Sequence, residues 1–168
     1  VKLSDLVTGH LKEFNEPAIS LDFIIERMCI GGWPSLIGES TKNALNMNRS
    51  YVDLLCEVDM SNVSGVRRDP HKVRSLLRSL ARNIATLVDN TTLEKDVKSR
   101  DINELSRNTI SDYLNALSRL MILYEQPAFN MHIRSSASLR KSPKRHLCDT
   151  SLAVAALGLD KESLTKDI

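Results

Sequence analysis

Residues that could form an active site are scattered along this chain. The three cysteines and four histidines are Cys29, Cys56, Cys148, His10, His71, His132 and His146. No Cys-x-x-Cys pair and no His pair at i, i+4 spacing occurs among them, which disfavours a disulfide framework, a zinc site and a catalytic triad. The glycine pair Gly31-Gly32 is followed by Trp33-Pro34 and lacks the Lys-Ser/Thr of a phosphate-binding loop, so it predicts a structural turn. We therefore predict no catalytic residue, no metal site and no cofactor site in this chain.

A basic segment near the carboxyl end gives the clearest binding signal. Twelve residues, 134–145, hold five cations and no acid: Arg134, Arg140, Lys141, Lys144 and Arg145. Such a cluster can neutralise several phosphates, each contributing about one unit to the salt dependence of binding. Basic loop tips also occur on proteins that never contact DNA, so both interpretations stay open at this point.

The stretch LSRNTISDYLNALSRLMIL, residues 105–123, predicts an amphipathic helix that leads into an apolar strand. Its inward positions, at helical spacing, are Ile110, Tyr113, Leu114, Leu117 and Leu120. The polar positions could hydrogen-bond base edges or phosphates, and the candidates are Arg107, Asn108, Thr109, Ser111, Asn115 and Arg119. We expect Asn108 or Thr109 to cap this helix. Asp112 counts against nucleic acid, because a carboxylate beside phosphates costs electrostatic energy.

Residues 70–148 predict a mainly α winged helix-turn-helix with a small β-hairpin as its wing. An apolar stripe begins after Pro70 and continues to Val88, so the first helix is predicted to end at Asp89-Asn90. Thr91 to Glu94 resembles a capping box for a short second helix. After the third helix, segments 129–133 and 146–148 are expected to pair as a hairpin, with the basic segment at its tip.

The rest of the chain predicts further helices. Residues 21–30 and 41–60 have helical apolar spacing, and residues 150–157 are expected to be helical up to Gly158. Hydrophobic residues make up 42% of the chain but aromatic residues only 4%, which favours aliphatic helix packing. The net charge of +2 does not by itself indicate a nucleic-acid partner. No apolar run is long enough to span a membrane, and the separate cysteines fit a reducing, cytoplasmic compartment.

Five segments in this order resemble one family: FIIERMCIGGWPSLI, SYVDLLCEVDMSNV, VRSLLRSLARNIATLV, NTISDYLNALSRLMILYEQPAF and LRKSPKRHLCDTSLAVAAL. They are similar to the part that follows the nucleotide-binding core in bacterial and archaeal AAA-type ATPases carrying the domain of unknown function 4143. The positions that match the family's motifs lie in the Gly31-Gly32-Trp33-Pro34 turn, the 109–117 helix and the 141–149 strand region. The matching residues of the last two are Thr109, Ile110, Tyr113, Leu114, Leu117, Lys141, Pro143, Lys144 and Asp149.

The resemblance implies a division into a helical lid-like segment (1–65), a winged helix-turn-helix (66–149) and the start of a truncated following domain (150–168). It also implies ATP and Mg for a missing N-terminal core, since the chain has neither a Walker lysine loop nor an acidic Mg-binding strand. The acidic residues of a following nuclease-like domain are missing as well. Because the chain opens at Val1, we expect a fragment of a longer protein that has no catalytic centre of its own.

Three functional hypotheses follow from the sequence. In the first, the winged helix binds duplex DNA or regulates a larger ATPase, whose lid movement would reposition it. In the second, the third helix docks on the ATPase core of the same protein or on another subunit of a homo-oligomer, and no DNA is bound. Asp112 and the near-neutral charge favour this second hypothesis. A self-standing transcription regulator is the weakest of the three, because it leaves the N-terminal helices unexplained.

Overall fold

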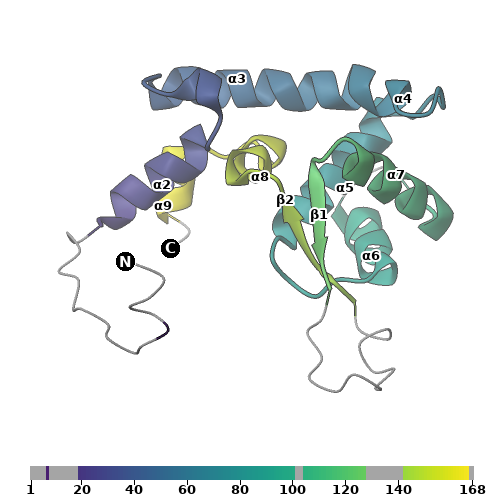
Figure 1. Cartoon of the computed structure of the whole chain (residues 1–168). Coiled ribbons are helices and arrows are strands. Elements are labelled where there is room, and N and C mark those ends of the chain that lie inside the picture. Colours follow the sequence, from purple (N-terminus) through teal and green to yellow (C-terminus); the bar gives the residue numbers. More distant parts are fainter. Residues whose placement is uncertain (1–6, 8–18, 101–103, 128–141, 167–168) are drawn as a thin grey trace.

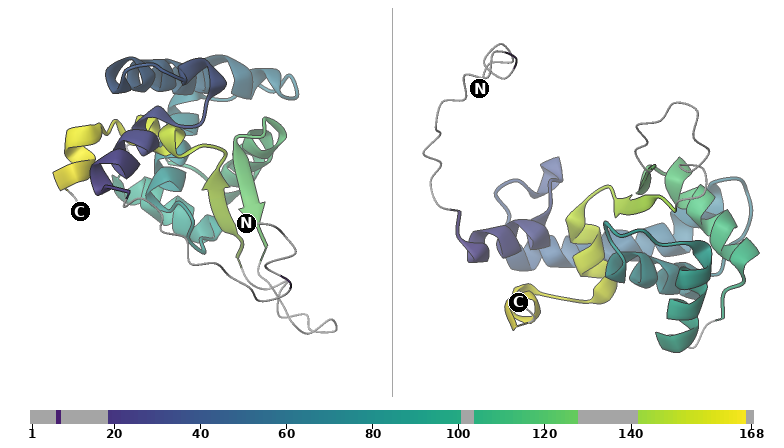
Figure 2. Two further views of the ribbon diagram at one scale, coloured as in Figure 1. Left: turned by 60° about the vertical axis from the view of Figure 1, so that its left-hand side comes forward. Right: turned by 90° about the horizontal axis from the view of Figure 1, so that it is seen from below.

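The computed structural model describes residue 7 and residues 19–100, 104–127 and 142–166. Helix α3 (Thr41–Leu54) lies across the top of the molecule in Figure 1, with two groups of elements beneath it. Helices α2 (Leu21–Ile30) and α9 (Lys161–Lys166) lie under one end, and the winged-helix elements lie under the other. Helix α8 (Thr150–Leu157) lies between the two groups. Seen from below in Figure 2, α3 runs behind the remaining helices.

The N-terminal helices begin and end at identifiable side chains. Ser20 caps α2, because its hydroxyl accepts a hydrogen bond from the Phe23 N–H at 3.2 Å. The buried Asn48 of α3 donates to the last carbonyls of α2, to Cys29 at 3.1 Å and to Ile30 at 3.3 Å. These bonds satisfy carbonyl groups that a helix end leaves free, so they fix α2 against α3.

Helix α3 continues through a π-helical turn, η2 (Leu55–Asp59), into α4 (Met60–Asn62). The short 3-10 turn η1 (Pro34–Leu36) precedes α3. The helix expected over 41–60 is therefore confirmed, with one wider turn inserted. A π-turn rotates the side chains that follow it, and here Val52 before the turn, Leu55 and Cys56 within it and Met60 after it are all buried.

The winged-helix order predicted for residues 70–148 is confirmed. Helices α5 (Pro70–Arg82), α6 (Asn90–Arg100) and α7 (Arg107–Arg119) are followed by strands β1 (Leu123–Gln126) and β2 (Lys144–Leu147). The strands pair antiparallel from Leu123↔Leu147 to Gln126↔Lys144. The strand predicted over 121–127 forms over 123–126 and is itself the partner of β2, whereas the expected partner segment 129–133 lies outside the described residues. The chain is mainly α with a small two-stranded hairpin.

Helix α5 ends earlier than the sequence predicted. It stops at Arg82 and not at Asp89-Asn90, because Asn83 closes it with both its backbone N–H and its side-chain amide on the Ser79 carbonyl. The chain then turns through Ala85, whose φ is +59°. From there it runs beside β2, where Leu87 forms an isolated bridge with Lys144. Strand pairing thus replaces helix over residues whose apolar spacing continued the helical pattern.

Two predicted caps are also wrong. Asp89, and not Thr91, caps α6, since its carboxylate accepts from the Thr92 N–H at 2.7 Å. Ser106, and not Asn108 or Thr109, caps α7 by accepting from the Thr109 N–H at 3.2 Å. In both cases an Asp or Ser three residues before the bonded N–H already occupied the cap position.

The largest hydrophobic cluster of the described residues contains members of all three segments into which the sequence was divided, and two smaller clusters hold α2 against α3 and α8. The buried members of the largest cluster include Val52, Leu55 and Met60 from the α3–α4 region, Leu76 and Leu117 from α5 and α7, and Leu152 from α8. Helix α8 packs against α5, α3 and α2. Residues 150–157, expected to start a following domain, are therefore an integral part of this core, and the core crosses the boundary expected at residue 65.

Candidate nucleic-acid interface

Helix α7 is held by its apolar face and presents a polar face to solvent. Ile110 and Leu117 are fully buried, and Tyr113 accepts a hydrogen bond on its hydroxyl from the Asp69 N–H at 3.3 Å. The exposed positions of the helix are Arg107, Asn108, Ser111, Asp112, Asn115, Ser118 and Arg119. Because the buried positions recur every three to four residues, these polar side chains form one continuous outward face.

The carboxylate of Asp112 is paired with a buried arginine. Arg68, only 4% exposed, donates from Nε to Asp112 Oδ2 and from Nη2 to Oδ1, both at 2.9 Å. Its Nη1 donates to the carbonyl of Met60 at 2.6 Å, at the α4 end of the N-terminal helices. This two-pronged pair neutralises the only acid in α7. The repulsion expected between the Asp112 carboxylate and a phosphate is therefore largely offset by the Arg68 charge.

A polar groove runs between α7 and the loop that precedes α5. It has a volume of about 550 Å³, and Ser64, Arg68, Asp112, Asn115, Ala116, Ser118 and Arg119 line it. Arg119 crosses one end, where its Nη1 donates to the Ser64 hydroxyl at 2.7 Å. Hydroxyl, amide and guanidinium groups thus surround an open cleft beside the outward face of α7.

Besides Arg119, three of the predicted α7 residues make side-chain contacts within the chain. Arg107 pairs with Glu94 of α6 at 2.8 Å, and Ser111 accepts from the Asn90 amide at 2.9 Å. Thr109 is half-buried, and its hydroxyl lies 2.9 Å from the Ser106 hydroxyl. Asn108 and Asn115 make no side-chain hydrogen bond with any residue that the structure describes. Among the α7 candidates, these two amides and Arg119 are the groups best placed to meet a ligand.

The two predicted wing residues that the structure describes differ sharply. Arg145 is only 7% exposed and is fully engaged, with Nε on Glu125 at 2.7 Å, Nη1 on the Val88 carbonyl at 2.8 Å and Nη2 on Asn90 at 3.0 Å. Its side chain therefore fastens the hairpin to the start of α6. Lys144 is exposed on β2 and has no ion pair with a described residue. Arg134, Arg140 and Lys141 lie outside the described residues.

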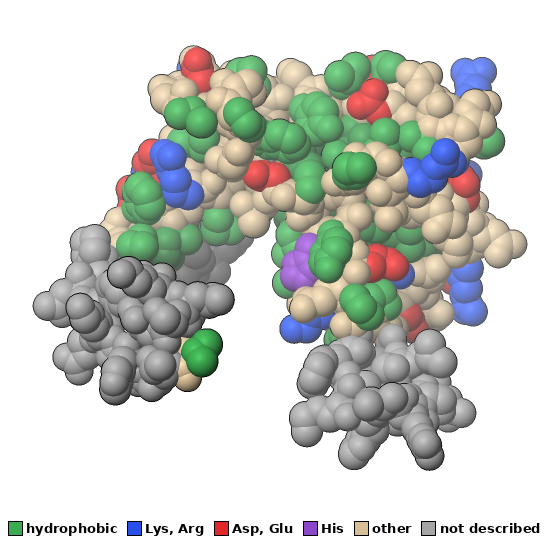
Figure 3. All heavy atoms as spheres, viewed as in Figure 1, with side chains coloured by type: hydrophobic (Ala, Val, Ile, Leu, Met, Phe, Trp, Pro, Cys, Tyr) green, Lys and Arg blue, Asp and Glu red, His purple; other side chains and the backbone are tan. Residues whose placement is uncertain are grey.

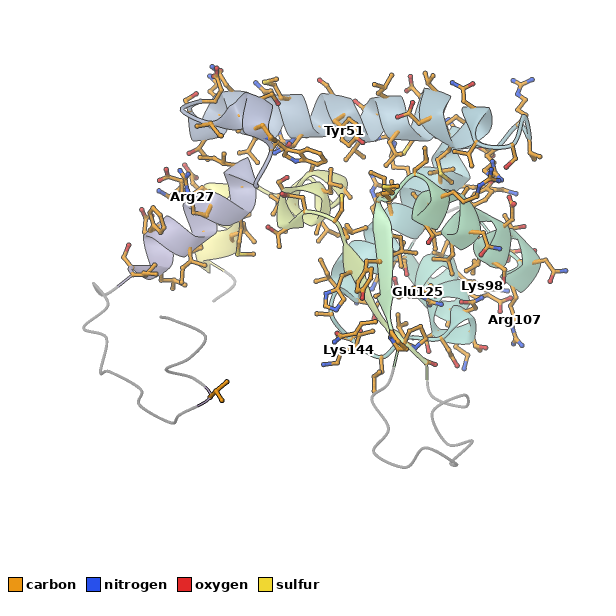
Figure 4. All side chains as sticks on the ribbon, in the orientation of Figure 1. Arg27, Tyr51, Lys98, Arg107, Glu125 and Lys144 are labelled. Carbon is orange, nitrogen blue, oxygen red and sulfur yellow. The ribbon has the colours of Figure 1, made fainter. Side chains whose placement is uncertain are left out.

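The described cations are distributed over several elements. Figure 4 shows Lys98 and Arg107 on the α6–α7 side and Lys144 at the foot of the hairpin. On the face drawn in Figure 3, Lys and Arg side chains form separate clusters without merging into one basic area. Lys98 is paired with Glu104 at 3.3 Å, in addition to the Arg107–Glu94 pair. The described part of the interface is thus polar with local charge, and not strongly basic.

Two of the cysteines first considered for chemistry occupy buried positions in the helical core. Cys29 and Cys56 are buried, and burial raises the pKa of the Cys56 thiol to about 11. Within the described ranges, no group of three His, Cys, Asp or Glu residues is placed to hold a metal ion. The same part of the chain has no helix that is both long and apolar enough to cross a bilayer.

The glycine-rich turn packs onto the N-terminus of α8. The Gly32 N–H donates to Asp149 Oδ2 at 2.7 Å, and Trp33 Nε1 donates to the Ser151 hydroxyl at 3.1 Å. Gly31 has a φ of +79°, and a Cβ there would collide with the Asp149 carboxylate and the Ser151 side chain. Asp149 also caps α8 through the Ser151 N–H at 2.8 Å. Two motifs 117 residues apart therefore meet at one carboxylate.

Sequence reasoning missed the two residues that brace this interface from outside it. Arg68 lies between the helices expected over 41–60 and after Pro70, where no binding residue was predicted, and Asn90 was expected only to end a helix. The local signal at Arg68 was slight: an Arg-Arg-Asp run just before Pro70. Neither partner could be inferred, because Asp112 and Arg145 lie 44 and 55 residues further along the chain.

The comparisons with known proteins identify a family but no function. A family model described as "Domain of unknown function (DUF8612)" matches residues 21–163, from the start of α2 into α9. No curated protein and no solved structure matches the chain. The match covers both the N-terminal helices and the winged helix, in agreement with their common core. The chain belongs to this DUF8612 family.

Proposed function

We propose that this member of the DUF8612 family is a nucleic-acid-binding module that contacts duplex DNA through the outward face of α7 and the hairpin. The observation that carries the proposal is the polar row Asn108, Asn115 and Arg119, exposed beside an open groove. Amide groups can pair with the edge of adenine, and a guanidinium can pair with guanine or a phosphate. The Arg68–Asp112 pair supports this role, because it removes the net charge of the one carboxylate on that face.

The hairpin would supply further phosphate contacts. Lys144 is exposed at its foot, and Arg134, Arg140 and Lys141 precede it in the sequence. Arg145 is left out of the proposed contact set, since its three hydrogen-bond partners already occupy its guanidinium. The module would belong to a larger AAA-type ATPase, a context that rests on the sequence resemblance. Because α3, α5 and α8 share one core, the N-terminal helices and the winged helix would move as one body in that setting.

The test is fluorescence anisotropy with labelled duplex DNA over a salt series. We expect the wild type to bind with micromolar affinity or better at moderate salt, and Asn115→Ala/Arg119→Ala to weaken binding at least about tenfold. Changing Arg140, Lys141 and Lys144 to Ala should lower the salt slope by about one unit for each phosphate that the variant no longer neutralises.

Arg27→Ala is the matched control for removal of a positive charge. Arg27 is an exposed cation on α2, at the opposite end of the molecule, where it forms an ion pair with Glu26 and lies over the Phe23 ring. Its replacement should leave the affinity within about twofold of wild type. Equal weakening by the control and the α7 double variant would contradict a contact through α7.

A second candidate, a winged helix used for protein docking, is supported by a different observation. Met47, Leu54 and Val58 lie between 43% and 48% exposed on one flank of the helical segment that starts at Thr41. Absence of DNA binding at moderate salt would favour this candidate, in which the apolar flank adds to the α7 face as a docking surface for the ATPase core or for a second copy of the chain.

A further inference from the structure

The hairpin has an outer face that does not follow the usual polar pattern. On its inner face, Leu123, Arg145 and Leu147 are buried against the helices. Successive strand residues point to opposite sides, so Tyr124 and Gln126 of β1 share the outer face with Lys144 and His146 of β2. An outward position on a half-buried hairpin normally carries a polar residue, whereas Tyr124 places a large ring there with 62% of its surface exposed.

Tyr124 and His146 lie directly opposite each other in the register. Directly opposed side chains on an antiparallel pair have their Cβ atoms about 5 Å apart, so the two rings are neighbours on the same surface. Neither ring makes a hydrogen bond or an aromatic contact with another described residue. On the face drawn in Figure 3, a histidine lies beside hydrophobic side chains over this part of the molecule. The pair therefore forms a small, open aromatic surface.

Polar and charged groups border this surface on one side. The next pair in the register is Gln126↔Lys144, and both side chains are exposed. Leu87, 61% exposed, is bridged to Lys144 and extends the apolar part. The one carboxylate on the neighbouring strand position, Glu125, is held by Arg145 at 2.7 Å. The Tyr124 ring is thus open to solvent. It lies next to the Gln126 amide and the Lys144 ammonium, and Lys144 has no ion pair with a described carboxylate.

We propose that Tyr124 and His146 form a stacking platform for one unpaired base of a nucleic acid, with Lys144 on the adjoining phosphate. The proposal deepens the proposed function and rests on it. Bases stack on exposed aromatic side chains whatever their identity, and a cation beside the ring tracks the backbone. A purely apolar docking surface would not need a Lys and a Gln along its border. The α7 face offers no exposed ring, because Tyr113 is buried, so the platform adds a contact that α7 cannot make.

The experiment compares a blunt duplex with the same duplex carrying a single-stranded overhang that contains 2-aminopurine. We expect the wild type to bind the overhang duplex at least about fivefold more tightly and to quench the 2-aminopurine fluorescence. Tyr124→Ala should abolish both the preference and the quenching, whereas Tyr124→Phe, which keeps the ring, should retain them. Phe23→Ala is the control for loss of an exposed ring, since Phe23 is 50% exposed on α2.

The outcomes separate the two proposals. Equal affinity for the blunt and overhang duplexes, without quenching, overturns the platform and leaves the α7 contact standing. Binding to neither duplex overturns both and favours a protein partner for this face. Loss of the preference in Tyr124→Ala counts only if its thermal unfolding and circular dichroism match those of Tyr124→Phe. If Tyr124→Ala is misfolded, His146→Ala and the quenching signal of the wild type decide the question.

Discussion

At the scale of single residues, the two arginine–carboxylate pairs of α7 differ in what surrounds them. Arg68 is buried and holds Asp112 with two hydrogen bonds, whereas Arg107 is 63% exposed and holds Glu94 with one. Removing one partner of a buried pair leaves a charge without compensation, whereas exposed pairs contribute little to stability. The two pairs therefore have different roles, although both involve the same helix.

We expect Asp112→Ala to lower the free energy of unfolding by about 2–3 kcal/mol, because it leaves the Arg68 guanidinium buried with only carbonyl partners. Arg107→Ala is the matched variant and should cost less than about 1 kcal/mol. Urea unfolding followed by circular dichroism measures both. Equal losses would mean that the Arg68 guanidinium reaches solvent when its partner is removed.

The cysteines allow a second test at this scale. Cys29 and Cys56 are buried and Cys148 is exposed, and burial raises the pKa of Cys56 to about 11. Because only the thiolate reacts, a buried thiol with a high pKa is inert at pH 8. With Ellman's reagent at pH 8 we expect one thiol to react in the native protein and all three after unfolding. Rapid reaction of a second thiol without denaturant would contradict the packing of α2 or η2.

At the scale of elements, two adjacent residues of the hairpin are expected to have different roles: Lys144 in binding and Arg145 in stability. Lys144 is exposed, and Arg145 joins β2 to Val88 and Asn90 at the start of α6. We expect Arg145→Ala to lower the free energy of unfolding by about 2–3 kcal/mol, because it leaves the Val88 carbonyl buried without its donor. Lys144→Ala should change stability by less than about 0.5 kcal/mol and weaken DNA binding instead. Thermal unfolding and anisotropy on the same two variants check this division.

The Arg82–Asp96 ion pair between α5 and α6 should make the stability of that contact depend on pH. Burial acts to raise the pKa of Asp96, but the hydrogen bonds and charge of Arg82, together with Arg100, hold it below its usual value. A carboxyl whose pKa is lower in the folded protein contributes stability above its unfolded pKa and loses it as the pH falls through the folded value. We expect the wild type to lose more stability between pH 7 and pH 3 than Asp96→Asn does. Parallel curves for the two proteins over that range would contradict the prediction.

Apolar spacing predicted which helices and strands form, but not where helix α5 ends. The helical faces of α5 and α7 and the strand at 123–126 follow from apolar spacing, and all three are present. The end of α5 does not follow from spacing, because Ile84, Leu87 and Val88 happen to continue its pattern while the chain leaves the helix at Asn83. Leu87 is in fact 61% exposed, at the edge of the hairpin. Pairing with a strand far along the chain overrides a local pattern, and local sequence does not encode that partner.

The sequence predicted which α7 residues face solvent, but it did not predict which residues hold the hairpin and α7 in place. The polar face of α7 could be read from its sequence, since amphipathic spacing determines which residues point outward. The burial of Arg145 could not be predicted, because it lies in a run of cations with Lys141 and Lys144, and such cations are usually exposed to solvent. Only the position of Asn90 and the Val88 carbonyl in space decides that Arg145 is structural.

At the scale of the whole molecule, α3 and α8 contribute to both the large hydrophobic cluster and the smaller clusters around α2, which should give one unfolding transition. Trp33, the only tryptophan, lies where the glycine turn meets α8, and its ring packs edge-on against Tyr51 at 5.4 Å between centroids. Its fluorescence therefore reports on the N-terminal side, while circular dichroism at 222 nm reports on all the helices. We expect the two urea curves to coincide, as in a two-state protein. Separate midpoints would show that the N-terminal helices and the winged helix unfold as independent units.

The contact of Gly31 with Asp149 and Ser151 also limits how this family can change its sequence. A side chain at position 31 would need a different backbone turn and smaller groups at positions 149 and 151 at the same time. Single replacements at any of the three positions lose either the turn, the cap of α8 or the Trp33 hydrogen bond. Sequences that diverge from this one should therefore vary at the three positions together or not at all.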